Sequence, residues 1–225
     1  ICLVISGNKE IDLNGYKIVL ENTANTYFSE TTSWIRVENG GKLTIANGTI
    51  KGKNANNTNR YSAGTVTVQG ELVTTNVNIA NTSPGSAVYC NGGKITASSG
   101  QFEALNGYAL HVGSSGTPEI SLRGGVVLKT TTGEGVPEQS SLKGYGALNY
   151  SAFSGALNVD NAEFLGGISV RDSLINAFST DSHTVEYALE KSGTYTKLSA
   201  NIPTTKTGEL YWYGTGVLPL ICTEK

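Results

Sequence analysis

The chain has 225 residues, 28 of them glycine, and 16 basic and 18 acidic side chains that give a formal net charge of −2. This balance excludes a nucleic-acid partner held mainly by phosphate contacts and a polybasic membrane anchor. No apolar run approaches the roughly 20 residues that span a bilayer, so we expect no membrane insertion. Abundant glycine, asparagine, threonine and serine favour strands and turns over helices.

Apolar residues recur in three groups per repeat from the start of the chain. The first repeat has Leu3 and Ile5, then Ile11 and Leu13, then Ile18. A spacing of two within a group is the period of a strand with one buried face. The later repeats, in chain order, are Ile35, Val37, Leu43, Ile45 and Ile50; Val66, Val68, Leu72, Thr74 and Ile79; Val88, Cys90, Ile95, Ala97 and Phe102; Leu110, Val112, Ile120, Leu122 and Val127; Leu148, Tyr150, Leu157, Val159 and Phe164; and Ile168 with Val170.

The second and third groups are seven residues apart in all six complete repeats, for example from Ile11 to Ile18 and from Ile120 to Val127. A small residue, such as Gly48, often stands two positions before the third group and suits a tight corner. Three short strands per repeat, each with an inward face, predict a three-faced parallel solenoid of six or seven coils. The general rule for parallel crossovers predicts a right-handed one.

Residues 173–225 follow the repeat less well. They contain alternating apolar residues and the segment 210–213 (LYWY), which predicts a strand. A solenoid needs its open end covered, since exposed strand edges recruit other chains. We therefore predict parallel coils over residues 1–172, and a last irregular coil with a β-rich C-terminal cap over residues 173–225.

The segments 11–18 (IDLNGYKI) and 41–45 (GKLTI) resemble the pectate-lyase-like superfamily of right-handed parallel β-helices. The closer similarity is to the coils of bacterial cell-surface and adhesin-type proteins. The resemblance covers about residues 1–172 and implies a single-stranded right-handed parallel β-helix in an extracellular or cell-surface location. The chain has no Met and starts at Ile1, from which we expect a processed fragment with its leader upstream.

Long insertions leave the predicted solenoid at one corner, between the third group of one repeat and the first group of the next. Insertions gathered on one edge of a solenoid often carry functional residues. The outward position of the first strand carries Arg36, Thr67, Tyr89, His111, Asn149 and Ser169 down the stack. Aromatic faces beside hydrogen-bonding groups suit sugar rings. The candidate ligand-binding residues are Trp34, Arg36, Tyr89, His111, Asn149, Tyr27, Tyr61 and Tyr145. The alternatives are that these aromatic side chains pack on the solenoid wall, that His111 is an ordinary surface residue, and that Arg36 only pairs with Glu38.

Catalytic motifs are missing. Glycoside hydrolases need two carboxylates flanking one bond, whereas Asp160, Glu163 and Asp172 are predicted to project from different corners. Two histidines and three widely spaced cysteines offer no metal-ligand pattern, so we expect no cofactor and no metal, with Cys90 as a small buried hydrophobe.

We therefore expect a non-catalytic, secreted or cell-surface module for adhesion or glycan binding, with a polysaccharide or surface glycan as partner. The alternatives are a structural or assembly module, such as a phage tail-associated fibre domain, and a diverged polysaccharide lyase or hydrolase.

Overall fold

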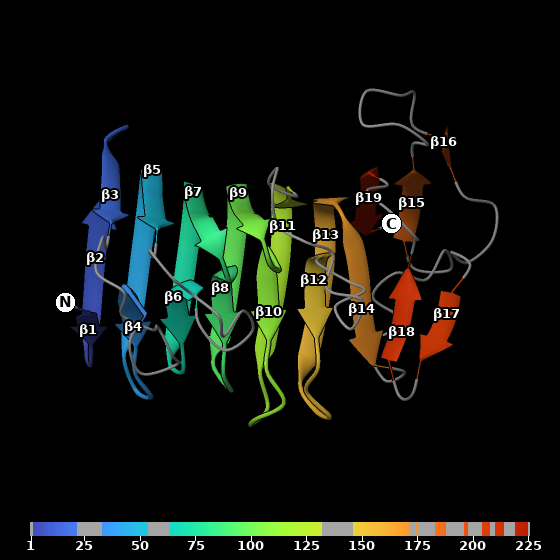
Figure 1. Ribbon diagram of the computed structural model, residues 1–225, viewed down its shortest axis with the longest axis horizontal. Coiled ribbons are helices and arrows are strands. Elements are labelled where there is room, and N and C mark those ends of the chain that lie inside the picture. The colour runs from blue at the N-terminus through green and yellow to red at the C-terminus, as the bar shows by residue number, and fades with distance from the viewer. Residues whose placement is uncertain are drawn as a thin grey trace.

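The computed structural model describes residues 2–21, 33–53, 64–131, 146–171, 174, 183–187, 196–197, 204–207, 210–213 and 219–224. Strands joined by turns and bends dominate these residues, and none of them lies in an α-helix (Figure 1). The described part of the protein is all-β, as predicted.

One sheet of nine strands contains the first group of every repeat. Its strands lie in the order β1 (Leu3–Ile5), β4 (Ile35–Val37), β6 (Gly64–Val68), β8 (Ser86–Cys90), β10 (Leu110–Val112), β12 (Gly146–Tyr150), β14 (Gly167–Arg171), β18 (Leu210–Tyr213) and β17 (Thr204–Thr207). From β1 to β14 every neighbouring pair is parallel, so successive repeats stack in chain order.

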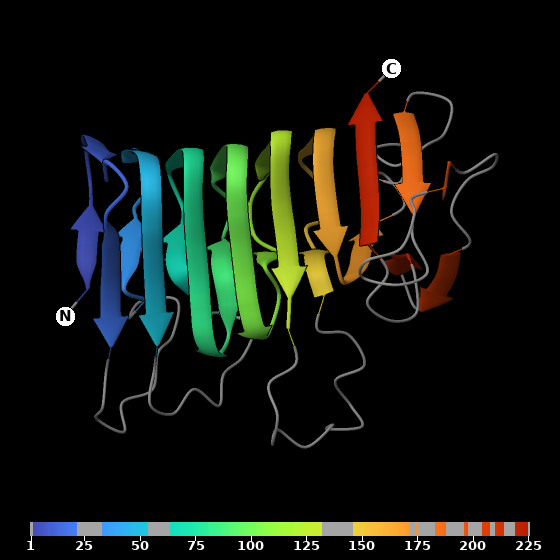
Figure 2. The same ribbon diagram turned by 90° about the horizontal axis from the view of Figure 1, so that it is seen from above.

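A second sheet of ten strands contains the second and third groups. Its order is β16 (Thr196–Lys197), β15 (His183–Tyr187), β19 (Pro219–Glu224), β13 (Ala156–Leu165), β11 (Glu119–Thr130), β9 (Lys94–Asn106), β7 (Glu71–Pro84), β5 (Lys42–Lys53) and β2 (Asn8–Asp12), with β3 (Lys17–Glu21) also paired to β5. Figure 2 shows the long strands of this sheet side by side. Parallel sheets stacked in sequence order are the arrangement expected of a β-solenoid.

The predicted second and third strands are one continuous, bent strand in each repeat from β5 to β13. The bend falls at residues with left-handed backbone, including Asn47 (φ 53°), Asn76 (φ 53°) and Asn161 (φ 55°). Asparagine tolerates this conformation better than most residues. The Asn76 side chain also donates to Asn47 Oδ1 at 3.3 Å, so the bends are tied together from strand to strand. The residue at the bend, such as Asn47, thus lies one position before the small residue, such as Gly48, that was predicted at the corner.

The first repeat departs from the predicted spacing. Lys9, rather than Ile11, is aligned with Leu43, whereas the third group is aligned as predicted. The intervening segment is therefore two residues longer than in the next repeat, and Asn14 and Gly15 take up the extra length in a turn with φ of 47° and 81°. The assignment of Ile11 to the start of the second group is therefore wrong, because Lys9 holds that position. Ile11 lies two residues after Lys9 and is seven residues before Ile18, so it matched the expected spacing.

The fifth repeat departs for a similar reason. Leu128, not Val127, is aligned with Phe102 in the preceding repeat. Gly124 and Gly125, with φ of 65° and 80°, form an irregularity that adds one residue to the strand. Val127 consequently faces outward and is only partly buried, so its assignment to the core is wrong.

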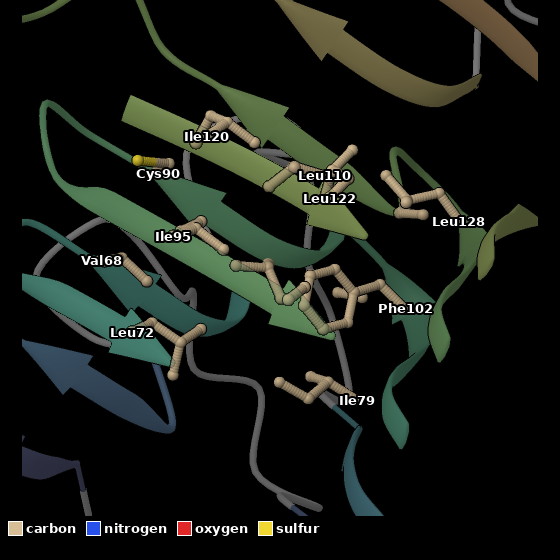
Figure 3. Packing of buried hydrophobic residues seen from close by; sticks show 14 of the residues in the cluster. Val68, Leu72, Ile79, Cys90, Ile95, Phe102, Leu110, Ile120, Leu122 and Leu128 are labelled. Carbon is tan, nitrogen blue, oxygen red and sulfur yellow. The ribbon is translucent and has the colours of Figure 1, made fainter. Parts of the chain in front are cut away.

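The inward residues of both sheets form one continuous apolar core (Figure 3). Leu43, Leu72 and Ile95 lie in one aligned column and have no exposed surface. Burying such a side chain contributes about 1.5–3 kcal/mol. Thr74 is a polar residue in this core: it is fully buried in the column of Ile45 and its hydroxyl has no hydrogen-bond partner among the described residues.

After Arg171 the pairing changes from parallel to antiparallel. β18 pairs with β14 and β19 pairs with β13, so that antiparallel strands cover the last edge of each sheet (Figure 2). β17, β15 and β16 extend these edges further. Covering an edge in this way protects it from pairing with other chains. The division into domains at residue 172 stays a prediction.

Candidate functional site

The predicted outward column of the first strands is aligned as expected. Arg36 is aligned with Thr67, Thr67 with Tyr89, Tyr89 with His111, and His111 with Asn149 across β4, β6, β8, β10 and β12. Neighbouring strands lie about 4.8 Å apart, so these five side chains form an unbroken row along the stack.

The centre of this row is closed. Tyr89 and His111 expose only 5% and 8% of their surface, and Thr67 exposes none. The His111 ring contacts two phenol rings, with centroid distances of 5.1 Å to Tyr89 and 5.3 Å to Tyr108. A Cβ on Gly113 would lie 2.6 Å from the Tyr89 hydroxyl, so glycine at this position makes room for that ring. The structure thus brings Tyr89 and His111 together in a packed aromatic cluster.

Sequence reasoning missed Tyr108 in this cluster because Tyr108 precedes β10 and belongs to no apolar group of the repeat. Only the packing of the segment before β10 against the row places its ring beside His111.

The two ends of the row are more open. Trp34 and Arg36 are half-buried, and Arg36 Nη2 donates to Glu38 Oε1 at 2.8 Å. Asn149 is half-buried as well, and its Oδ1 accepts from the Ser151 hydroxyl at 2.8 Å. Tyr27, Tyr61 and Tyr145 lie outside the described residues. Ligand binding by the predicted set stays a prediction.

An open groove of about 450 Å³, here called the strand-face groove, lies on the outer side of the second sheet. Its side chains come from the parts of β3, β5, β7 and β9 that follow the bend. They include Lys17, Thr49, Lys51, Asn78, Thr82, Gln101 and Glu103. The register places Thr49 beside Asn78 and Asn78 beside Gln101, so a polar row crosses the strands.

A small side chain deepens this groove. Ala80 is aligned between Lys51 and Glu103, whose long side chains stand on either side of it. Glu103 accepts from Gln101 at 3.0 Å and forms an ion pair with Lys129 at 2.9 Å. Lys51, by contrast, has no acidic partner among the described residues.

A second, shallower groove of about 540 Å³ follows the corner between the two sheets. Glycines line its floor, and their backbones pack closely from one repeat to the next. A Cβ on Gly70, for example, would lie 2.2 Å from the carbonyl oxygen of Gly41. Its charges are already paired, Lys42 with Glu71 at 3.1 Å and Lys94 with Glu119 at 3.2 Å. Such exposed pairs add little stability. Sequence reasoning missed this corner, and the repeated Gly–Lys and Gly–Glu steps at 41–42, 70–71 and 93–94 are a signal that could have located it.

Within the part of the chain that the structure describes, no group of three His, Cys, Asp or Glu side chains is placed to hold a metal ion. Cys90 is fully buried in the core, as predicted, and burial raises its thiol pKa to about 12. A thiol held protonated in this way packs as a small hydrophobe rather than acting as a nucleophile.

None of the described segments is a helix with the length and apolarity needed to cross a membrane. No protein-family model, curated protein or solved structure matches the chain.

Proposed function

We propose that the chain is a non-catalytic, secreted or cell-surface β-solenoid module that acts in adhesion through glycan binding. We take the solenoid to be a right-handed, three-faced β-helix of six or seven coils, on the general preference of parallel crossovers for that hand. The strand-face groove carries the proposal, because it is an open polar surface that crosses several parallel strands.

The chemistry of the groove suits sugar hydroxyls. Asn78 and Gln101 each offer an amide that both donates and accepts, and Thr49 adds a hydroxyl. These groups stand in one row across β5, β7 and β9. Because the same strand spacing separates each of them from the next, an elongated polymer lying along the stack meets similar contacts repeatedly.

The groove does not support hydrolysis. Glycoside hydrolases flank the scissile bond with two carboxyl groups about 5–10 Å apart. Glu103 is the one acidic side chain among the described residues that line the groove, and Lys129 and Gln101 already engage it. Binding without cleavage is the activity that this arrangement favours.

Affinity electrophoresis through gels cast with a panel of plant, bacterial and host polysaccharides tests the proposal. We expect retarded migration without clearing in at least one gel. Lys51→Gln and Asn78→Ala should reduce the retardation several-fold. Arg123→Gln, an exposed change on β11 that does not line the groove, should leave the retardation unchanged.

The same gels separate the alternatives. If Trp34→Ala and Arg36→Ala abolish retardation while Lys51→Gln does not, the ligand binds the first-strand row. Clearing of a polysaccharide would indicate a diverged lyase or hydrolase. Unchanged migration in every gel would contradict glycan binding and favour a structural or assembly module.

A further inference from the structure

Asparagine followed by glycine is the step in a protein chain at which asparagine is chemically least stable. The backbone nitrogen of the following residue attacks the side-chain amide carbon, and glycine hinders this approach least because it has no Cβ. The chain has five such steps, which begin at Asn14, Asn39, Asn47, Asn91 and Asn106. The fold places them in different surroundings, so the structure decides which of them reacts.

The reaction has two structural requirements. The side-chain amide must rotate over its own backbone, so hydrogen bonds to that amide oppose the reaction. The attacking N–H must also lose its proton, so an N–H that already donates to a carbonyl oxygen is protected. A step that fails either requirement reacts only when its segment opens locally.

Two of the steps are held by hydrogen bonds at the bend in the second sheet. The Gly15 N–H, which follows Asn14, donates to the Asn47 carbonyl oxygen at 2.7 Å. The Asn47 side chain donates to Asp12 Oδ1 at 3.2 Å and accepts from the Asn76 amide at 3.3 Å. Asn47 also lies within β5. Both steps are therefore protected, although both asparagines are exposed.

Two other steps are restricted by packing. Asn91 is half-buried and engaged by neighbouring groups, and Gly92 packs against the backbone of the next turn along the stack. Asn106 is the last residue of β9, and Gly107 is buried against Gly85. We expect slow reaction at both positions.

The step at Asn39 meets both requirements. Asn39 and Gly40 are exposed and form the turn after β4, which the Gly41 N–H closes by donating to the Glu38 carbonyl oxygen at 2.8 Å. Among the described residues, no hydrogen bond holds the Asn39 side chain or the Gly40 N–H. A Cβ on Gly40 would meet no atom within 4 Å, so the space around the turn is open.

We propose that Asn39 is a site of spontaneous deamidation. The Gly40 backbone nitrogen loses its proton and forms a bond to Asn39 Cγ, and the bond from Cγ to the side-chain nitrogen breaks and releases ammonia. Water then hydrolyses the resulting cyclic imide at one of its two carbonyl groups, which yields aspartate or isoaspartate. The sequence consumes one water molecule, and no group is oxidised or reduced.

The product changes the charge of the groove along the corner between the two sheets, which Asn39 lines. The charged side chains lining that groove form two ion pairs, Lys42 with Glu71 and Lys94 with Glu119, so their charges cancel. Deamidation adds a carboxylate to this neutral surface, and isoaspartate also lengthens the turn by one backbone atom. Asn39 does not line the strand-face groove, so the inference is independent of glycan binding there.

Tryptic peptide mapping after incubation of the folded chain at mildly alkaline pH tests the proposal. Each of the five steps falls in a different tryptic peptide, that of Asn39 being residues 37–42. Incubation in water labelled with heavy oxygen, followed by digestion in ordinary water, marks only the conversion that occurs in the folded protein. The urea-unfolded chain, treated in the same way, gives the rate of each step without the fold.

We expect Asn39 to convert at close to its rate in the unfolded chain, and the other four asparagines to convert several-fold more slowly than in the unfolded chain. Asn39→Gln is the matched variant, because the longer side chain forms a cyclic imide far more slowly, and its peptide should stay unlabelled. Circular dichroism before and after incubation checks that the fold is kept.

Three results would overturn the proposal. The fold could protect Asn39 as strongly as it protects Asn47, another of the five steps could convert faster in the folded chain, or label could remain in peptide 37–42 of Asn39→Gln.

Discussion

Two buried threonines allow a sharp test of the packing, because the structure predicts opposite effects for the same substitution. Thr74 and Thr65 are both almost completely buried. The Thr65 hydroxyl donates to the Ala80 carbonyl oxygen at 2.8 Å, whereas the Thr74 hydroxyl has no partner. Valine has nearly the shape of threonine and lacks the hydroxyl, so Thr→Val isolates the polar group at each site.

The magnitudes follow from the two environments. An unsatisfied buried hydroxyl costs about 1–3 kcal/mol, so Thr74→Val should raise the free energy of unfolding by roughly that amount. A satisfied hydrogen bond contributes about 0.5–1.5 kcal/mol, so Thr65→Val should lower the free energy of unfolding. For a chain of this length each kcal/mol moves the melting temperature by about 2–4 °C.

Urea denaturation followed by circular dichroism measures both variants, with equal slopes required before the midpoints are compared. The expected result is a higher midpoint for Thr74→Val and a lower one for Thr65→Val. Equal losses in both variants would show that the Thr74 hydroxyl has a partner in solution, and would refute this account of the core. The Thr74→Val/Thr65→Val double variant should be additive if the two sites are independent.

Three further predictions concern other parts of the stack. Gly70→Ala should lower the free energy of unfolding by more than about 1 kcal/mol, as backbone clashes commonly do, because its Cβ would lie 2.2 Å from two carbonyl oxygens. Gly7→Ala, whose Cβ would meet open space, should be near neutral in the same denaturation assay. Native alkylation at pH 8, read by mass spectrometry, should spare Cys90 until denaturant is added; rapid modification in the folded state would contradict its burial. The folded state raises the Cys90 pKa to about 12, so the stability that this thiol contributes is present below its unfolded pKa of about 8.5 and is lost as the pH rises toward 12. In denaturation series above pH 9, the Cys90→Ala variant should therefore lose less of its free energy of unfolding than the unsubstituted chain.

Much of the register could be predicted from the sequence, for a physical reason. A strand buried on one face repeats its apolar side chains with a period of two, and stacking in parallel keeps equivalent residues in line. The column from Arg36 through Tyr89 to Asn149 was predicted from this periodicity alone, and each adjacent pair in it is aligned in the structure.

The errors arose where the backbone gains residues without an apolar signal. The turn at Asn14 and the irregularity at Gly124 each lengthen a repeat, and a nearby apolar side chain reproduced the expected spacing. Periodicity reports the direction of a side chain along one strand, but it carries no information on the length of the turn between two strands.

The sequence by itself therefore determined the all-β class, the parallel order of the repeats and most of the inward residues, because these depend on local alternation. The tertiary structure alone decided what happens on the outside. It packed His111 against Tyr89 and Tyr108, and it hollowed a groove above Ala80. These features depend on which distant segments come to lie side by side, and no period along one strand records that.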